Sequence, residues 1–379
     1  MIPYGRQCLD ENDIQAVVEV LRSDWLTTGP KVIEFEKAFA DLVGAKEAVA
    51  VSSGTAALHA AMYALDIKPG DEVIVPAMTF VATANCVVFQ GGKPVFADVD
   101  PETLLVDPEE VEKKITSTTR AVIGVDYAGQ PCDYDILRDI AKRHNLALVD
   151  DACHALGATY NGSPVGSLAD LNTFSFHPVK HVTTGEGGMV TTDDSELAKG
   201  MRSFRNHGIT SDHHQRELQG SWHYEMVDLG FNYRLTDIQC ALGLSQLKKL
   251  SEYIELRNQI AKKYDQAFVE IGEVEPLRVS DAVKHAYHLY VVRLSKNLDR
   301  SEVFRNLRKM GIGVNVHYMP VHLHPYYRTL FGFGFGLCPN AEETYERILS
   351  LPIFPSMSDK DVESVIESVR KVVREGAGD

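Results

Sequence analysis

The chain has 379 residues, and its 53 acidic against 38 basic residues give a formal net charge of −15 at pH 7. A content of 44% hydrophobic and 24% charged residues is that of a soluble globular protein and excludes a disordered, collagen-like or disulfide-stapled chain. So negative a surface repels a phosphate backbone, and nucleic acid is not expected as a partner. At about 100–200 residues per domain, the length predicts two or three packed units.

Six cysteines are spread along the chain without a CxxC pair, which indicates reduced thiols and a cytoplasmic location. The first residues, MIPYGRQCLDEND, lack the apolar stretch of a signal peptide. No window approaches the roughly 18 uninterrupted apolar residues that a membrane span requires. We therefore expect a cytoplasmic protein that does not enter a membrane.

Two helices are predicted first. Apolar residues recur at helical spacing from Ile14 to Leu21, which indicates an amphipathic helix facing a core. A second helix is predicted from Pro30 to a stop at Gly44, because proline favours the first helical turn and glycine the position after the last. The segment SDWLTTGP (23–30) between them is expected to be irregular.

From residue 47 onward, short apolar runs alternate with helical stretches. Continuous apolar runs suit strands covered on both faces, and their alternation with helices predicts βαβ units around a parallel sheet. Ligands are expected beyond the carboxyl ends of such strands. The last run follows two glycines and could equally be an antiparallel addition. The seven predicted strands are 47–51, 71–75, 93–98, 120–125, 146–150, 172–176 and 188–192.

The C-terminal third predicts a second, smaller α/β unit, entered through one long helical stretch. We expect residues 1–245 to form the large domain with its N-terminal helices, and residues 246–379 the small domain. The elements expected in this part are a helix over about 235–271, a strand at 286–294, a helix at 300–310, a strand-like segment at 313–318, a loop at 331–336 and helices at 341–350 and 358–374.

One lysine has unusual surroundings. The stretch FSFHPVKHVTTGEGG (174–188) places Lys180 after a predicted strand and before paired glycines, in an irregular loop. Most lysines of any chain are simply solvated. A lysine at the carboxyl edge of a sheet can instead be desolvated, lose its proton and attack a carbonyl carbon.

Two more segments follow predicted strands and contain polar or aromatic residues. SSGTAAL (52–58) combines small residues with a helix start, whose N–H groups can bind a phosphate, although many helices use Ser-Gly-Thr as an ordinary cap. PAMTFVATAN (76–85) places Phe80 where its ring could stack on a ligand.

A pair of adjacent carboxylates follows the fifth predicted strand, in LVDDACHALGA (148–158). One of Asp150 and Asp151 can face the site while the other faces the structure. His154 comes three residues after Asp151. Both aspartates could also be helix caps, but one short segment does not need two.

Together these segments resemble the DegT/DnrJ/EryC1/StrS family of pyridoxal-phosphate sugar aminotransferases over nearly the whole chain. The resemblance implies fold type I, the aspartate aminotransferase architecture: α/β, with a large, mostly parallel seven-stranded sheet domain and a smaller C-terminal α/β domain. It also implies a homodimer with a shared active site. The motifs that carry it are LTTGP, SSGTAAL, PAMTF, DDACHALGA, SFHPVK, TTGEGG, GFNYRLTDIQCALG, VHYMP and LPIFPS.

The resemblance also implies residue roles around pyridoxal 5′-phosphate (PLP). Lys180 resembles the lysine that forms the internal aldimine, and Asp151 the carboxylate beside the pyridine nitrogen. A buried anion keeps that nitrogen protonated, so the ring can accept the electrons of a broken C–H bond. The family often has Glu-Asp where this chain has Asp-Asp, a chemically mild departure. The other implied cofactor contacts are His154 near the 3-hydroxyl, Phe80 on the ring, Gly54, Thr55 and Ser175 at the phosphate, and Asn232 from the neighbouring subunit.

The implied reaction transfers an amino group from L-glutamate to a nucleotide-linked 4-keto-6-deoxy sugar. HPVK before TTGEGG, GFNYRLTD before ALGLSQLKKL, and VHYMPVHLHPYY are most similar to the branch of the family that aminates the UDP-4-keto sugar of pseudaminic acid synthesis. His317 and Tyr318, in VHYMP, are expected to line the sugar pocket, with a core role for the tyrosine equally open. The choice of nucleotide, and of C3 or C4 amination, stays open.

Two other functions share parts of this pattern. A PLP- or PMP-dependent nucleotide-sugar 3-dehydratase on the same scaffold would have histidine in place of the aldimine lysine. Lys180 argues against it, although His181 is adjacent. A non-catalytic regulatory relative should have lost Lys180, Asp151 or the phosphate-binding residues, and all are present.

Each of the remaining polar groups could have either a structural or a functional role. No carboxylate or cysteine nearby completes a ligand set for His317 and HLHPYYR (322–328), so no metal site is expected. Arg234 could bind a diphosphate or pair with Asp237. His213 and His214 are expected in a loop near the substrate entrance.

Overall fold

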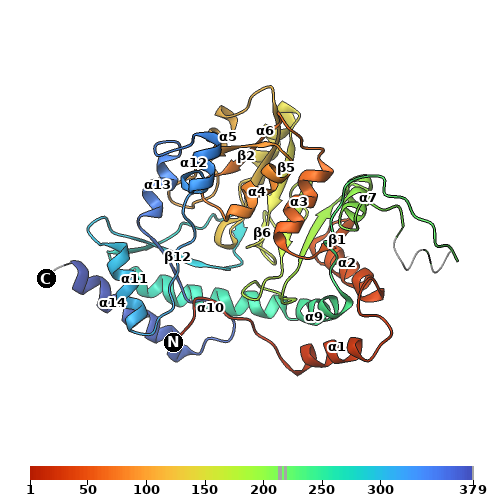
Figure 1. Ribbon diagram of the computed structural model, residues 1–379. Helices are drawn as coiled ribbons and strands as arrows, with labels where there is room; N and C mark the ends of the chain where they lie inside the picture. The colour runs from red at the N-terminus through yellow and green to blue at the C-terminus, as the bar shows by residue number, and fades with distance from the viewer. Residues whose placement is uncertain (212–215, 217–219, 378–379) are drawn as a thin grey trace.

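The computed structural model describes residues 1–211, 216 and 220–377. Its centre is a seven-stranded sheet in the order β1-β9-β8-β5-β4-β2-β3 (Figure 1). The sequence predicted all seven strands with each boundary within one residue. The strands are β1 (Glu47–Val51), β2 (Glu72–Pro76), β3 (Lys93–Ala97), β4 (Thr119–Val125), β5 (Ala147–Asp151), β8 (Leu171–Ser175) and β9 (Gly188–Thr192).

The sheet is mostly parallel, as predicted. Strands β3, β2, β4, β5 and β8 run parallel to one another, whereas β9 is antiparallel to both β1 and β8. The alternative left open for the last strand is therefore decided. The connection from β8 to β9 contains no crossover helix, and a parallel return would need one.

Helices cover the sheet and bury its apolar strands (Figure 1). The first predicted helix begins after the Asp10 cap, but two residues of its expected core face are exposed: Ile14 is 52% and Leu21 55% accessible. Buried Asp13 instead accepts a hydrogen bond from Gln246 Nε2 at 2.8 Å. The helices of this part are α1 (Glu11–Leu21), α2 (Pro30–Val43), α3 (Gly54–Ala64), α4 (Val81–Phe89), α5 (Pro108–Lys113), α6 (Tyr134–His144) and α7 (Ser195–Phe204).

The long helix predicted over 235–271 is two helices, α9 (Asp237–Leu247) and α10 (Leu250–Phe268). The prediction of one continuous helix was wrong because the chain makes a turn at Lys248 and Lys249. The Lys249 ammonium reaches back to Asp10 and Asp13 at the start of α1.

A second apolar core surrounds a small antiparallel sheet of β10 (Val274–Pro276), β12 (Tyr290–Leu294) and β13 (Ile348–Leu351), with further two-residue strands β6 (Thr159–Tyr160), β7 (Ser163–Pro164) and β11 (Val283–Lys284) elsewhere. The division at residue 245 stays a prediction. The helices of this part are α11 (Arg300–Lys309), α12 (Pro325–Phe331), α13 (Pro339–Tyr345) and α14 (Asp359–Ala377), and the 3₁₀ turns of the chain are η1 (Tyr127–Gly129) and η2 (Val321–Leu323).

Three predictions for this region need correction. The strand predicted at 286–294 begins only at Tyr290, because the backbone before it bonds to the loop after β4. The segment 313–318 is irregular apart from one bridge between Asn315 and Ser350. The helix predicted over 341–350 ends at Tyr345, because the buried residues that follow pair with β12 as β13.

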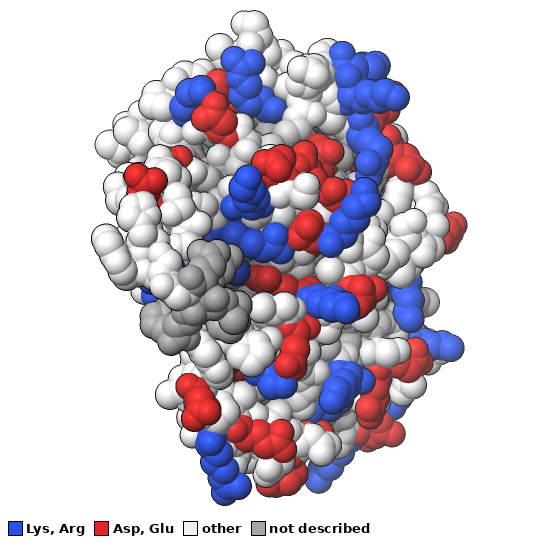
Figure 2. All heavy atoms as spheres, turned by 90° about the vertical axis from the view of Figure 1, so that its right-hand side faces the viewer, with Lys and Arg blue, Asp and Glu red and all other residues white. Residues whose placement is uncertain are grey.

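Charge on the surface is mixed rather than segregated. On the face shown in Figure 2, Lys and Arg side chains alternate with Asp and Glu, and neither sign covers the face alone. Among the helices that the structure describes, none is long and apolar enough to cross a bilayer.

Candidate active site

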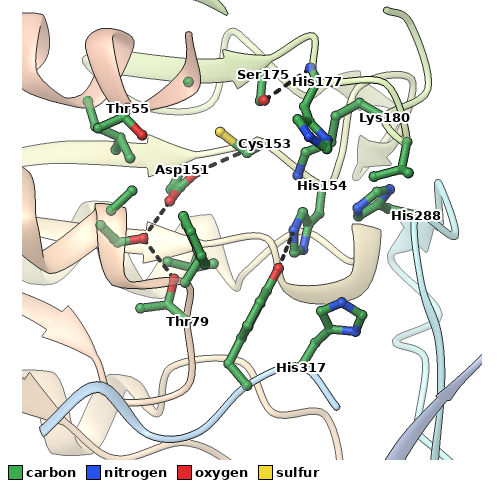
Figure 3. A pocket seen from close by; sticks show the side chains of 18 of the residues that line it. Thr55, Thr79, Asp151, Cys153, His154, Ser175, His177, Lys180, His288 and His317 are labelled. Atoms are coloured by element: carbon green, nitrogen blue, oxygen red, sulfur yellow. Dashed lines mark hydrogen bonds between the residues drawn. The ribbon is translucent and has the colours of Figure 1, made fainter. Parts of the chain in front are cut away.

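A cavity of about 530 Å³ opens at the carboxyl ends of the parallel strands, where the sequence predicted a ligand (Figure 3). One wall comes from the end of β5, the end of β8 and the start of α3. The opposite wall comes from irregular segments of the C-terminal part and from the N-terminus. Of the predicted site residues, the cavity is lined by Gly54, Thr55, Phe80, Asp151, His154, Ser175, Lys180, His317 and Tyr318.

The start of α3 forms one end of the cavity. Ser53 caps this helix, and its Oγ accepts a hydrogen bond from Ala56 N at 3.1 Å. The N–H groups of Gly54 and Thr55 have no acceptor among the described residues. A Cβ on Gly54 would lie 2.8 Å from the Cβ of Ser175, so only glycine allows this approach. Open N–H groups beside a serine hydroxyl form an anion site suited to a phosphate.

Asp151 lies at the other end of the large-domain wall. Its Oδ2 accepts a hydrogen bond from Thr83 Oγ1 at 2.7 Å, and its Oδ1 one from Cys153 N at 3.3 Å. Since Thr83 donates to the carboxylate, Thr79, whose Oγ1 is 2.7 Å away, donates to Thr83. The sequence missed both threonines, although they lie four residues apart in the segment that supplied Phe80.

Asp150 faces the interior while Asp151 faces the cavity, so the two adjacent aspartates divide as the sequence predicted. It is fully buried against Asp126 and Tyr134, and burial raises its pKa well above the usual range. The single hydroxyl proton of Tyr134 goes to Asp126 Oδ1 at 2.8 Å. Neither oxygen of Asp150 has a hydrogen-bond partner among the described residues, and neither does Asp126 Oδ2, so burial favours the neutral form of these carboxyls. Burial also raises the pKa of Asp126, to about 7.

Lys180 points into the cavity. Burial lowers the pKa of its amine, and the neighbouring Cys153 and Asp151 only partly offset that shift. His181 does not line the cavity: it is buried, and its Nε2 lies 3.0 Å from the carbonyl of Ala286. The structure thus assigns the site-facing position to the lysine.

Aromatic rings surround the amine. His154 Nε2 lies 3.2 Å from Tyr318 Oη, and the His154 ring is 4.4 Å from that of His288, a residue the sequence analysis missed inside a predicted strand. Burial, reinforced by the Lys180 charge, lowers the pKa of both imidazoles well below the usual value. Both rings are therefore neutral near pH 7. Phe80 stays 54% exposed at the cavity surface, as a stacking ring requires.

His317 is held by the protein itself. Its Nδ1 lies 2.7 Å from Ser350 Oγ and its Nε2 3.2 Å from Asn315 Nδ2. Of the other histidines, His322 Nε2 lies 2.8 Å from Glu342. Within the described part of the chain, no three His, Cys, Asp or Glu side chains gather as a metal site. His213 and His214 lie outside the described residues.

Asn232 is exposed and does not line this cavity. It belongs to an extended pair of segments, residues 205–211 and 221–233, that we term the arm and that projects beyond α7 (Figure 1). Next to the arm, Arg234 donates to Asn206 Oδ1 at 2.7 Å. Asp237 accepts hydrogen bonds from Gly29 N and Lys31 N at the start of α2. The Arg234–Asp237 pair considered above is therefore absent.

The chain is similar to known proteins over nearly its whole length. A family model described as the DegT/DnrJ/EryC1/StrS aminotransferase family matches residues 7–370. The chain is 46% identical to the spore coat polysaccharide biosynthesis protein SpsC of Bacillus subtilis (98% of this chain, 97% of that protein). It is 39% identical to the UDP-4-amino-4-deoxy-L-arabinose–oxoglutarate aminotransferase of Shewanella sediminis (98% of each).

Solved structures share the fold over the whole chain. Spr1654 from Streptococcus pneumoniae superposes in its PMP form with a TM-score of 0.94 at 36% identity (99% of this chain, 100% of that chain), and its PLP form with 0.93. PseC of Helicobacter pylori, an aminotransferase involved in the biosynthesis of pseudoaminic acid, superposes with a TM-score of 0.92 at 34% identity (99% of each).

Proposed function

Because the chain belongs to the DegT/DnrJ/EryC1/StrS aminotransferase family, we propose that it transfers an amino group from L-glutamate to a nucleotide-linked 4-keto-6-deoxy sugar. The predictions of family, fold class, enzyme class and PLP cofactor are confirmed. One observation carries the proposal furthest. An amine of lowered pKa, Lys180, shares one cavity with the Asp151 carboxylate and an open helix N-terminus.

The residues present fit PLP. The N-terminus of α3 and Ser175 would hold the phosphate, Asp151 the ring nitrogen, Phe80 the ring face and Lys180 the aldehyde carbon. When bound, the cofactor supplies a ring that accepts the electrons of a broken C–H bond. Asp151 suits its place because Thr83 Oγ1 and Cys153 N both donate to its carboxylate and hold it at the cavity wall.

Side chains of the protein would transfer the proton between the donor and the sugar. A Lys180 amine of lowered pKa can take a proton from the donor's α-carbon near neutral pH and later return one to the sugar carbon. The neutral His154 and Tyr318 rings orient the bound groups without adding a competing charge. The small-domain wall covers the reacting atoms and limits access of water.

For the substrate, we propose a UDP-linked 4-keto sugar of pseudaminic acid synthesis or of a related surface-glycan pathway. Likeness to PseC supports the first, and likeness to SpsC and to the arabinose aminotransferase supports the wider class. The oxoglutarate in the latter's name is the keto acid of glutamate, which supports the proposed donor. A cytoplasmic location fits six free cysteines.

A homodimer with a shared active site is part of the proposal. Ile14 and Leu21 of α1 are exposed in the single chain, and so is the arm, where Trp222 is 85% and Leu229 70% accessible. Large exposed apolar surfaces of this kind suit a subunit interface. In such a dimer Asn232 would reach the neighbour's phosphate, and Arg234 would lie beside the diphosphate of the substrate.

The dehydratase alternative is less well supported. It needs a histidine where the amine stands, but Lys180 lines the cavity and His181 is bonded to backbone away from it. A regulatory role without catalysis would leave the perturbed lysine and the fixed carboxylate unexplained.

The decisive experiment incubates the holoenzyme with L-glutamate and a panel of UDP-, dTDP- and GDP-linked 3-keto and 4-keto sugars, with product masses read by mass spectrometry. We expect one amino sugar, from a UDP-4-keto-6-deoxy sugar, together with 2-oxoglutarate. The visible band of the bound cofactor should bleach with glutamate alone. Loss of a hydroxyl without gain of nitrogen would establish the dehydratase, and no half-reaction with any amino acid would support the regulatory alternative.

A further inference from the structure

The N-terminal residues 1–5 form a strap along the small unit, and the chain start lies near α14 in Figure 1. Ile2 N donates to Gly311 O at 2.8 Å, and Gly313 N donates to Ile2 O at 2.7 Å. Ile353 N donates to Tyr4 O at 3.1 Å. A Cβ on Gly313 would lie only 2.7 Å from Ile2 O, so the strap can lie this close only against glycine. The strap is thus a fixed part of the fold.

This strap carries Tyr4 into the active-site cavity. The side chain is half-buried and lines the cavity together with Lys180, and its ring lies 5.3 Å from that of His317. Burial raises the pKa of Tyr4, so the phenol keeps its proton near pH 7. In the part of the chain that the structure describes, its hydroxyl has no hydrogen-bond partner.

Two side chains beside Tyr4 on this wall, Tyr318 and His317, are already engaged. Tyr318 Oη is bonded to His154, and both ring nitrogens of His317 are bonded within the protein. A ligand seated beside these two side chains therefore meets the Tyr4 hydroxyl as an open hydrogen-bonding group. A protonated phenol both donates and accepts, and carries no charge.

We propose that Tyr4 is a specificity-determining residue that hydrogen-bonds the sugar ring of the nucleotide-sugar substrate. This inference rests on the proposed function and adds a residue to it. A ring hydroxyl or an N-acetyl group presents neutral donors and acceptors that match a phenol. Glutamate presents two carboxylates, whose strongest partners are cations, so the bond to Tyr4 contributes to the sugar half of the reaction.

The test separates the two half-reactions in the Tyr4→Phe holoenzyme. Glutamate is added first and the cofactor band is followed by stopped flow. The amine form is then mixed with a UDP-linked 4-keto-6-deoxy-N-acetylhexosamine. We expect the half-saturating concentration of the keto sugar to rise about three- to tenfold, the loss of one neutral hydrogen bond. The glutamate half-reaction should change less than about twofold, since it lacks that bond.

Tyr326→Phe is the matched control, because this tyrosine on α12 is 55% exposed and does not line the cavity. It should leave both half-reactions unchanged. Deletion of residues 1–4 should reproduce the sugar-specific loss, and unchanged cofactor absorbance and melting temperature would show that the variant is folded. If deletion unfolds the chain, Tyr4→Phe alone decides.

Equal effects of Tyr4→Phe on both half-reactions, or no effect on either, would overturn the role of Tyr4. These outcomes leave the proposed function standing whenever the wild-type enzyme aminates the keto sugar. If the wild-type enzyme completes the glutamate half-reaction but aminates no keto sugar, the proposed function fails and this inference fails with it.

Discussion

The two walls of the cavity are built on different principles. On the large-domain wall, the end of β5 holds a carboxylate, the loop after β8 holds an amine, and the start of α3 presents open N–H groups. On the opposite wall, irregular segments present neutral imidazoles and phenols. The large-domain wall thus holds the groups that drive the chemistry, and the opposite wall shapes the space that a substrate occupies. Substitutions on the first wall should affect turnover, and those on the second should affect substrate selection and acid stability.

The largest effect is expected from Lys180→Ala on the first wall. Removing the amine should lower turnover about 10³-fold or more, because Lys180 is both the proposed partner of the cofactor's aldehyde carbon and the group proposed to move the proton. Circular dichroism and the melting temperature should stay near those of the wild type, since the side chain is only partly buried. Turnover near the wild-type rate would refute the assignment of the chemistry to this wall.

A smaller effect on the same wall is expected from Thr83→Val. The change keeps the shape but removes the 2.7 Å hydrogen bond to Asp151, whose carboxylate is then less firmly oriented. We expect PLP to bind about tenfold more weakly, by equilibrium dialysis of the apoprotein. Thr118→Val, on an exposed threonine outside the cavity, is the control. Equal affinity in both variants would show that this bond does not support the cofactor site.

The contrast between the walls also explains what the sequence could reveal. The seven strands were predictable because each is a largely buried apolar run; Asp151 ends one of them, and Lys180 lies in the loop that follows another. The segment 313–318 alternates apolar and polar residues as a strand does, yet only Asn315 finds a partner strand. Tyr4 carries no local signal, because what places it in the cavity is backbone more than 300 residues away.

Acid should destabilise the second wall and its surroundings. His285 Nδ1 accepts a hydrogen bond from Tyr287 N at 2.8 Å, and burial lowers its pKa to about 3; burial also lowers that of His317 to about 4. The unfolded chain takes up these protons near pH 6.5, so stability is complete above that pH and falls as the pH drops toward 4. Each ring should cost on the order of 1–2 kcal/mol at pH 5.

Urea unfolding of the apoprotein between pH 7.5 and 5 checks this acid sensitivity. His285→Gln removes one titrating ring and should flatten the decline in unfolding free energy. His223→Gln, on an exposed ring outside the cavity, should leave the decline as it is. An unfolding free energy that stays constant down to pH 5 would contradict the prediction.

The smallest expected effect concerns two buried carboxyls behind the large-domain wall. Their contribution to the unfolding free energy depends on pH in the opposite direction to that of the histidines. Burial raises the pKa values of both Asp150 and Asp126, so folding above neutral pH must take up a proton that the unfolded carboxyls have lost. This pair is most favourable at low pH and loses stability as the pH rises. Asp150→Asn can donate an N–H to Asp126 without titrating. It should therefore raise the unfolding free energy by about 1 kcal/mol at pH 8 and by less at pH 6. A variant equally destabilised at both pH values would mean that the pair is not protonated, and that the large-domain wall rests on a buried charge after all.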